Sequence, residues 1–428
     1  MPLSRVRIAD GCVGGREHAM RVLFVTHAYH PSKGGVQWLM QSLAERLSAQ
    51  GDAVTVFTTV AHRCELFIDS RQPRLPVGEV TLNGVRVRRF DVFNRLTWLR
   101  LNAARVAHKL RLPGQDWVRG LYFGPIVPGL RRAILDQPAD VIVAASFPMI
   151  HMYDALAAGC ASGRPVVLVG TVHPADPWSY DLPRMYRAIR QAHAYVALSD
   201  YERDYLAARC PGARLHVIGG GVDTEAFASP AAGRAFRLQQ GWTDDALVIA
   251  MIGRMTAYKR ADVLLAAMPA IWEALPQARL LLAGAGEAAE LRKHAQALPH
   301  PQRVTILPDF DERDKPAIFC AADMIVHLSE RESFGMVIVE AWAAGKPVIG
   351  SRAGASASVI SDGEDGLLVQ YGDAAALARA VIALGNSATM RQALGRAGQA
   401  KARRLYDWQV VVPRYRALFN AWVEGKGA

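Results

Sequence analysis

Two glutamates, Glu332 and Glu340, stand eight residues apart in the stretch RESFGMVIVEAWAAG, residues 331–345. Glu340 lies within an apolar run of helical character, which predicts that its side chain is buried. A buried polar group without a partner costs about 2–7 kcal/mol. We therefore expect Glu340 to bind a ligand, and the hydroxyl groups of a sugar ring are donors that both carboxylates can engage.

Three cations lie close together in the stretch GRMTAYKRADVLLAAM, residues 253–268. Lys259 and Arg260 stand at the expected start of a helix, and Arg254 precedes them. The amino end of a helix favours negative charge, so cations placed there are unfavourable unless an anion joins them. The pattern predicts an anion site; the alternative is a solvated cluster on the surface.

Two other helix starts are expected to leave backbone N–H groups free for an anion. Gly34 and Gly35 open one helix, in HPSKGGV. At the other, we expect Ser333 to be the N-cap and Gly335 to lie in the first turn, where the N–H groups of residues 334–336 can bind a phosphate. An anion site beside carboxylates that accept from hydroxyl groups predicts a nucleotide sugar as the ligand.

The elements that must position these groups alternate along the chain. Short apolar runs rich in β-branched residues are separated by helical patterns, which predicts parallel strands covered on both faces. A glycine-rich stretch at 219–242 interrupts the alternation, so we predict an α/β protein with two doubly wound, Rossmann-like domains facing a cleft. Ligands of such sheets bind beyond the carboxyl ends of the strands. The expected strands are RVLFVT, AVTVF, VIVAA, VVLVG, AYVAL and LHVI in the first domain, and LVIAMI, RLLLA, VTIL, MIVHL and PVIG in the second.

The chain is basic, with a formal net charge of +11 over 428 residues, and the segment 86–132 holds 11 basic and 2 acidic residues. Within it, Leu96, Leu99, Val106 and Leu110 recur at helical spacing among arginines, beside Trp98. Such a basic amphipathic helix is typical of proteins that bind an anionic membrane surface. The alternative is a helix that packs its apolar face on its own domain.

Other classes are disfavoured by what the chain lacks. It has no run of about 18 apolar residues to span a membrane, and its five scattered cysteines predict reduced thiols, as in the cytoplasm. Gly345-Lys346 is followed by Pro347, which argues against a P-loop, and no dinucleotide fingerprint follows a strand. Aromatic residues do not interleave with the cations as in single-strand nucleic-acid binders. Residues 1–19 have no apolar core of a signal peptide, and we expect them to be poorly ordered.

The motifs in the second half resemble those of glycosyltransferase family 4, retaining enzymes with the two-domain GT-B fold. The resemblance is carried by GRMTAYKRADVLLAA, LLLAGAGE and, above all, ADMIVHLSERESFGMVIVEAWAAGKPVIG; in the first half it is looser, through HPSKGGV, VVLVGTVHPADPW and HVIGGGVDTEAF. It implies an acceptor domain at 20–222, a nucleotide-sugar domain at 223–406 and a final helix, 407–425, that crosses back to the first domain. Leu328 stands where the family commonly has proline, and Pro308-Asp309 where a glycine is usual.

The resemblance also implies roles for residues. Glu332 would contact the transferred sugar and Glu340 the ribose, while Arg254 and Lys259 would bind the diphosphate. The expected catalytic residues are His173, Glu332, Arg254 and Lys259, and the expected donor site comprises Gly34, Gly35, Gly253, Arg254, Lys259, Gly284, Pro308, Asp309, Glu332, Ser333, Phe334, Gly335, Met336, Val337 and Glu340.

The predicted function is therefore a retaining transfer of a hexose-type sugar, from a UDP-sugar or GDP-sugar, to an acceptor hydroxyl. Cations and helix ends would stabilise the leaving group, so neither a metal nor another cofactor is expected. The acceptor would be a sugar, a natural product or a lipid-linked group at the cytoplasmic face of the membrane. The alternatives are a nucleotide-sugar epimerase on the same fold and a non-enzymatic protein that binds surfaces through its basic segment.

Overall fold

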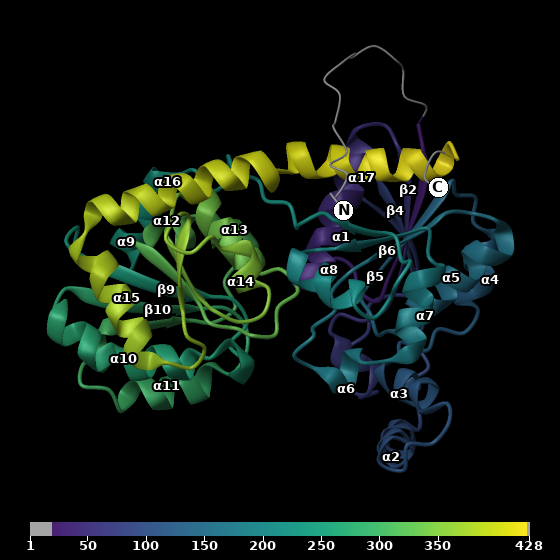
Figure 1. Ribbon diagram of the computed structural model, residues 1–428, viewed down its shortest axis with the longest axis horizontal. Coiled ribbons are helices and arrows are strands. Elements are labelled where there is room, and N and C mark those ends of the chain that lie inside the picture. Colours follow the sequence, from purple (N-terminus) through teal and green to yellow (C-terminus); the bar gives the residue numbers. More distant parts are fainter. Residues whose placement is uncertain (1–18, 426–428) are drawn as a thin grey trace.

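Two open sheets with helices on both faces form the computed structural model, which describes residues 19–425 (Figure 1). The first sheet has the order β3-β4-β2-β1-β5-β6-β7-β8 and the second the order β11-β10-β9-β12-β13-β14. The first comprises β1 Arg21–Thr26, β2 Ala53–Thr59, β3 Gly78–Leu82, β4 Val85–Phe90, β5 Val141–Ala145, β6 Val166–Val169, β7 Ala194–Ala197 and β8 Leu215–Val217. The second comprises β9 Leu247–Ile252, β10 Ala278–Ala283, β11 Val304–Leu307, β12 Met324–His327, β13 Val348–Ser351 and β14 Gly366–Val369.

Both sheets reverse their winding at a central strand. In the second sheet β9 lies between β10 and β12, so its order is that of a doubly wound dinucleotide-binding fold. In the first sheet β1 lies between β2 and β5, with Val22 opposite Val54 on one side and Val141 on the other. The central strands are buried on both faces, as their continuous apolar runs predict. The predicted fold class is confirmed.

One edge of the first sheet departs from the prediction of parallel strands alone. β3 and β4 form an antiparallel hairpin. Its turn is Asn83-Gly84, both with positive φ (46° and 81°), the dipeptide that favours tight hairpins. Exposed and buried residues alternate along β4, and β3 has no buried residue. The search for continuous apolar runs therefore missed this hairpin.

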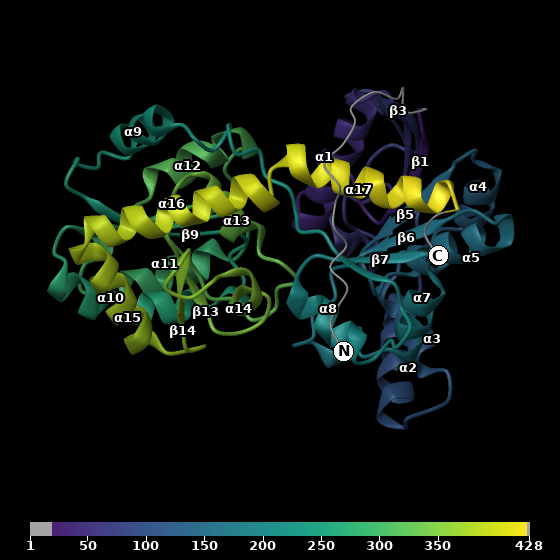
Figure 2. The same cartoon turned by 45° about the horizontal axis from the view of Figure 1, so that its top comes forward.

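Helices follow most of the strands. In the first half they are α1 Gly35–Ala49, α2 Thr97–Lys109, α3 Gln115–Phe123, α4 Leu130–Asp136, α5 Ile150–Ser162, α6 Pro177–Tyr180, α7 Pro183–Gln191 and α8 Asp200–Ala207. In the second they are α9 Pro230–Gln239, α10 Ala261–Ala274, α11 Ala288–Gln296, α12 Lys315–Ala321, α13 Met336–Ala343, α14 Ser356–Val359, α15 Ala374–Asn386 and α16 Ala388–Leu405. α2 and α3 project from the first half as a hairpin (Figures 1 and 2).

The last helix, α17 Trp408–Val423, lies across the first half beside α1 (Figure 1). The rings of Trp38 and Trp408 are 5.5 Å apart, and Arg416 pairs with Asp52. The chain crosses between the halves in two segments that bond to each other, since Val222 N–H donates to the carbonyl of Tyr406 over 2.7 Å. The limits at 222/223 and 406/407 stay a prediction.

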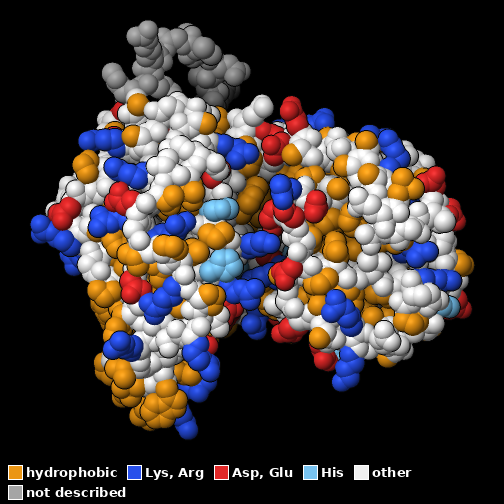
Figure 3. Space-filling view, turned by 180° about the vertical axis from the view of Figure 1, so that it is seen from behind, with side chains coloured by type: hydrophobic (Ala, Val, Ile, Leu, Met, Phe, Trp, Pro, Cys, Tyr) orange, Lys and Arg blue, Asp and Glu red, His pale blue; other side chains and the backbone are white. Residues whose placement is uncertain are grey.

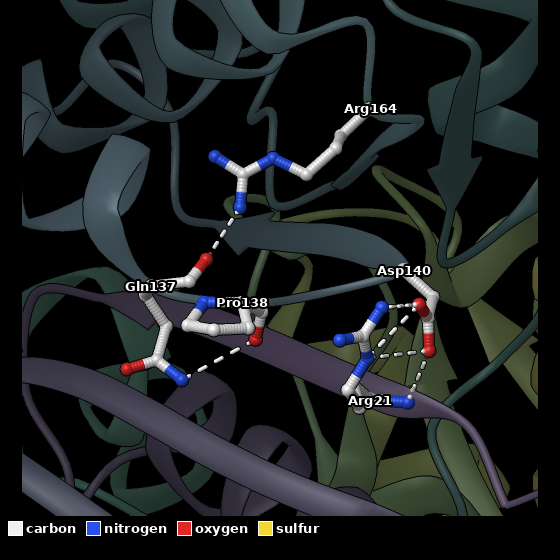
Figure 4. Close-up of polar contacts among 5 residues, drawn as sticks. All are labelled: Arg21, Gln137, Pro138, Asp140 and Arg164. Carbon is white, nitrogen blue, oxygen red and sulfur yellow. Dashed lines mark hydrogen bonds and ion pairs between the residues drawn. The ribbon is translucent and has the colours of Figure 1, made fainter.

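Polar contacts join strands of the first sheet at their amino ends. The Arg21 guanidinium and backbone N–H both donate to Asp140, which joins the start of β1 to that of β5 (Figure 4). Arg164 donates to the carbonyl of Gln137 over 2.6 Å in the same region. Because these contacts lie at the amino ends, they leave the carboxyl ends of the strands available for ligands. Among residues 19–425, no helix is both long and apolar enough to cross a bilayer. The predicted extension 1–19 lies, except for residue 19, outside the described residues.

Candidate active site

The loops beyond the carboxyl ends of β6, β9 and β12 bring charged side chains of both halves together. His173 follows β6 and is half-buried. Burial lowers its pKa, the charges of Lys259 and Arg254 lower it further, and those of Glu332 and Asp176 raise it. The charges of the other three expected catalytic residues thus all reach the His173 imidazole. Figure 3 shows a hollow between the two halves that basic and histidine side chains line.

Lys259 and Glu332 form an ion pair in this hollow, with 17% and 15% of their side chains exposed. The Nε2 atom of His327, at the end of β12, lies 3.8 Å from Glu332 Oε1. Burial alone would raise the pKa of Glu332, but Lys259 and His327 outweigh it and hold the pKa at about 2. Glu332 is thus a carboxylate at neutral pH. From the sequence, these two side chains were expected to bind different parts of a ligand, and their contact with each other was not predicted.

Lys259 and Arg260 were expected to need an external anion, and this expectation was wrong because each pairs with a carboxylate of the protein. Arg260 bonds to Asp262 over 3.0 Å, two residues along the chain, and Arg254 donates to the Tyr258 hydroxyl over 2.6 Å. A short 3₁₀ turn, Ala257–Lys259, precedes α10 and directs the lysine into the site. Lys259 and Arg254 therefore remain candidates for a diphosphate, whereas Arg260 has a local partner.

Glu340 has a protein partner as well. It is 1% exposed on α13, and Lys315, the first residue of α12, donates to its Oε1 over 2.6 Å. Burial would lower the pKa of Lys315, but the charges of Glu340 and Glu312 raise it overall. Glu340 Oε2 is buried with no hydrogen bond. The expectation that a ligand alone satisfies Glu340 was therefore wrong for one oxygen, and the second is the atom left for a hydroxyl group.

The loop before α13 differs from its expected capping. Gly335, at φ 94°, is the residue before the helix, and Ser333 caps nothing. Instead, the Ser333 carbonyl accepts from Ser199 Oγ of the first half over 2.6 Å, while the ring of Phe334 packs 5.3 Å from that of Tyr406. Met336 begins α13 and Val337 is buried in its first turn. The Ser333 carbonyl thus ties this loop to the first half, and the backbone N–H groups of the loop are what it can offer a ligand.

The predicted glycines leave space for a ligand or for a neighbouring loop. Gly34 and Gly35 open α1, and a Cβ on Gly35 would meet no atom within 4 Å, which leaves room for a ligand at that helix start. Gly284, at φ 144°, stands so close to Gly253 that a Cβ would lie 1.9 Å from its carbonyl oxygen. The loops after β9 and β10 can touch here only because residue 284 is a glycine.

Pro308 and Asp309 follow β11, and Asp309 adopts φ 50°. Asp309 and Asp311 make an Asp-x-Asp pair after a strand that the sequence analysis passed over. Both oxygens of Asp311 accept from Arg313. Among residues 19–425, no group of three or more His, Cys, Asp or Glu side chains is placed to hold a metal ion.

A cavity of about 330 Å³ lies in the second half beside the ion pair. Gly253, Arg254, Lys259 and His327 are among its lining residues, whereas Pro308 and Glu340 are not. Of the predicted donor residues, Gly253, Arg254 and Lys259 therefore line this cavity and the others do not.

A buried carboxylate that was not expected from the sequence, Glu202, supports the His173 loop. Glu202, on α8, is fully buried and accepts from the backbone N–H groups of Thr171 and Val172 over 3.0 and 2.8 Å. It also accepts from the Tyr195 hydroxyl over 2.6 Å. Its sequence context, SDYERDYL, reads as an ordinary polar helix. Only the packing of α8 on β7 and β8 brings Glu202 to the residues that lead to His173.

Two family models match the chain, one in each half. Residues 234–401 match "Glycosyl transferases group 1", and residues 33–226 match "Glycosyltransferase Family 4".

Several known proteins are similar over most of the chain. The phosphatidyl-myo-inositol mannosyltransferase of Mycobacterium leprae is 31% identical over 318 residues, 72% of this chain and 81% of that protein. The D-inositol 3-phosphate glycosyltransferase of Streptomyces avermitilis is 30% identical over 54% of this chain and 53% of its own length. Among solved structures, Anabaena HepE in complex with UDP and glucose has a TM-score of 0.66 at 20% identity, covering 94% of this chain and all of that one. Sucrose-phosphate synthase of Thermosynechococcus elongatus has a TM-score of 0.70 at 20% identity, over 95% of this chain and all of that one.

Proposed function

Since the chain belongs to the family 4 glycosyltransferases, we propose that it moves a hexose from a nucleoside-diphosphate sugar to an acceptor hydroxyl, with retention of configuration and without a metal. The chain is a glycosyltransferase of the GT-B fold with a nucleotide-sugar donor. Family membership decides against the epimerase and against the non-enzymatic surface-binding protein.

The observation that carries the proposal is the ion pair of Lys259 and Glu332, whose charges both act on the His173 imidazole. A cation suits the diphosphate, on which negative charge develops as the sugar leaves. A carboxylate held ionised beside it suits the hydroxyl groups of that sugar. When a diphosphate draws Lys259 toward itself, the carboxylate of Glu332 becomes free to accept hydrogen bonds from the sugar.

Retention requires the acceptor to attack the face from which the leaving group departs. In the proposed reaction, the bond between the anomeric carbon and the diphosphate oxygen breaks, and the acceptor oxygen bonds to that carbon. The acceptor proton goes to the departing phosphate oxygen. Glu332 positions the sugar and forms no covalent bond. Arg254 shares the charge on the diphosphate, since it lies in the same cavity as Lys259.

For the acceptor, we propose a hydroxyl group on a lipid headgroup at the cytoplasmic face of the membrane. Support comes from the relatives named as phosphatidyl-myo-inositol mannosyltransferases and from the exposed apolar and basic surface of α2. The relatives named as D-inositol 3-phosphate glycosyltransferases point to a soluble cyclitol phosphate as the other candidate. Both acceptors present a ring hydroxyl beside a phosphate.

The test has two stages. UDP-glucose, GDP-mannose and ADP-glucose are first compared by thermal shift, because a ligand that binds the native state raises its stability by mass action. The donor that stabilises the protein is then incubated with phosphatidylinositol vesicles or with myo-inositol 3-phosphate, and release of the nucleoside diphosphate is measured. Release that needs one acceptor supports transfer and identifies its class. Absence of stabilisation by every donor would contradict the proposal.

A further inference from the structure

The hairpin of α2 and α3 exposes the apolar stripe that was predicted from its spacing. Trp98 is 77% exposed, Leu96 65% and Val106 53%, and Leu99 and Leu110 are also exposed. The buried residues of α2 are Ala104 and Ala107. α2 therefore packs on its own domain through Ala104 and Ala107, whereas its apolar stripe faces solvent. Hydrophobic side chains cover the tip of this projection in Figure 3. A contiguous apolar patch exposed to solvent marks an interaction site.

The charge of the hairpin selects the partner. Residues 93–124 contain six Lys or Arg and one acidic residue, Asp116. Asp116 accepts from the Arg184 backbone N–H over 3.1 Å, at the base of the hairpin. Arg105 and Lys109 lie on the face of α2 beside the apolar stripe. Apolar side chains bordered by cations fit an anionic bilayer. A second copy of the chain would bring like charges together.

The base of the hairpin rests on the short helix α6, which follows the His173 loop. The ring of His108, near the end of α2, meets the Trp178 ring edge-on at 4.7 Å. The Arg119 guanidinium of α3 lies 4.7 Å from the centre of the same ring and donates to the Pro177 carbonyl over 3.4 Å. Both helices of the hairpin therefore hold one tryptophan between them.

From Trp178 the contacts continue to the active site. The Asp176 backbone N–H donates to the His173 carbonyl over 2.9 Å, and the Asp176 side chain caps α6 at Ser179. Tyr180, the last residue of α6, meets the His173 ring edge-on at 5.1 Å. A shift of α6 thus displaces both neighbours of His173.

We propose that the hairpin docks on an anionic bilayer and that Trp178 couples this docking to the loop carrying His173. The effect on catalysis rests on the proposed function, but the docking and the coupling do not. Docking is expected to hold α2 and α3 against α6 and so to restrict the segment 171–181. Nucleotide binding in the hollow is then linked to membrane binding, since each favours the same arrangement.

The experiment is hydrogen exchange of the full chain, with vesicles of phosphatidylcholine and phosphatidylglycerol and with vesicles of phosphatidylcholine alone. We expect the anionic vesicles to protect residues 93–124 and 171–181, and the neutral vesicles to protect them less. Trp98→Ser removes both effects. Leu238→Ser removes an apolar side chain equally exposed, at 75%, on α9 of the second half, and leaves both effects intact.

Two variants separate coupling from docking. Trp178→Leu and His108→Ala each remove one ring of the edge-on contact, and both variants are expected to bind anionic vesicles while losing the protection of 171–181. His108 is exposed, so its substitution keeps the test valid if Trp178→Leu fails to fold. With UDP as the probe, wild type is expected to bind about fivefold more tightly on vesicles, at the lower end of ordinary coupling. His108→Ala is expected to bind UDP equally with and without them.

Any result other than these contradicts one part of the proposal. Failure of wild type to bind anionic vesicles overturns the docking surface, as does a dimer in solution that Trp98→Ser dissociates. Docking that leaves 171–181 unchanged, or unchanged coupling in His108→Ala, overturns the role of Trp178. A lack of UDP binding in every arm contradicts the proposed function instead, and the exchange data still judge the coupling.

Discussion

Substitutions in the Lys259–Glu332 ion pair are expected to affect the stability of the protein and its affinity for UDP differently. In Lys259→Met the ammonium is lost while the length of the side chain is kept. Glu332 then remains a carboxylate that is 15% exposed, with the His327 imidazole 3.8 Å away as its neighbour. Removing one member of a buried pair leaves an uncompensated charge, which destabilises the protein.

The magnitude follows from the geometry. Two unit charges about 4 Å apart attract by about 4 kcal/mol at an effective dielectric constant of 20. The two side chains keep 17% and 15% of their exposure, so solvent screens part of this attraction. We expect Lys259→Met to destabilise the second domain by about 2 kcal/mol, or about 4–8 °C in its thermal midpoint. Glu332→Gln in the same chain should recover most of that loss, because an uncharged amide needs no cation.

UDP binding should respond differently. Loss of the Lys259 charge is expected to weaken UDP binding by about tenfold, or about 1.4 kcal/mol, in Lys259→Met and in the double variant alike. Calorimetric titration with UDP and thermal unfolding, both at pH 7, measure the two effects on the same samples. Lys293→Met, which removes an exposed lysine on α11, is the matched control and should change neither.

The pH dependence of the loss has a definite sign. In the native protein the pKa of Glu332 is about 2, below its ordinary 4.5, so the pair stabilises the fold above about pH 4.5 and loses this effect as pH falls toward 2. Without Lys259, burial raises the pKa of Glu332, and the penalty of the substitution should shrink as acid protonates it. UDP affinity equal to wild type in the double variant would refute the diphosphate role of Lys259, and additive destabilisation would refute the coupling of the pair.

Four further results are expected. Glu332→Gln should lower kcat by about 10- to 100-fold, the range of one hydrogen bond to a charged group, and loss to background in steady-state kinetics would indicate a covalent nucleophile instead. Turnover should persist in excess EDTA, and a complete loss that Mn²⁺ restores would defeat metal independence. Lys315→Met should lower the thermal midpoint, because it strands Glu340, whose side chain is 2% exposed, and adding Glu340→Gln should restore it; a neutral single variant would contradict the pairing. Because the pKa of His173 lies below its ordinary 6.5, kcat/KM should decrease on acidification only below about pH 6.5. A decrease that already begins above pH 7 in the pH profile of kcat/KM, and that His173→Gln removes, would contradict this.

The sheets could be predicted from the sequence because strands buried on both faces must be apolar along their whole length. Runs such as LVIAMI and VVLVG could not be confused with amphipathic helices. Predicting the strands also placed the residues after them at one edge of each sheet, so that His173, Lys259 and Glu332 were expected near one cleft. The hairpin β3–β4 was missed because β4 alternates buried and exposed residues and the edge strand β3 has no buried residue.

Charge partners could not be predicted in the same way. Lys259 and Glu332 are 73 residues apart, and Lys315 and Glu340 are 25 apart. Nothing in the residue pattern distinguishes a cation that awaits a ligand from one that a distant carboxylate already holds. Arg260 shows the reverse case, since its partner Asp262 was visible two residues along the chain and was still passed over.

The residue pattern alone was therefore enough to predict the class of the fold, the edge of each sheet where ligands bind and the kinds of groups placed there. These depend on local periodicity and on the direction of the strands. Only the tertiary structure decided which charges neutralise one another, which oxygen of Glu340 stays free and that the apolar stripe of α2 faces solvent. Such contacts depend on distances of a few ångströms between residues far apart in the chain, and no local pattern encodes those distances.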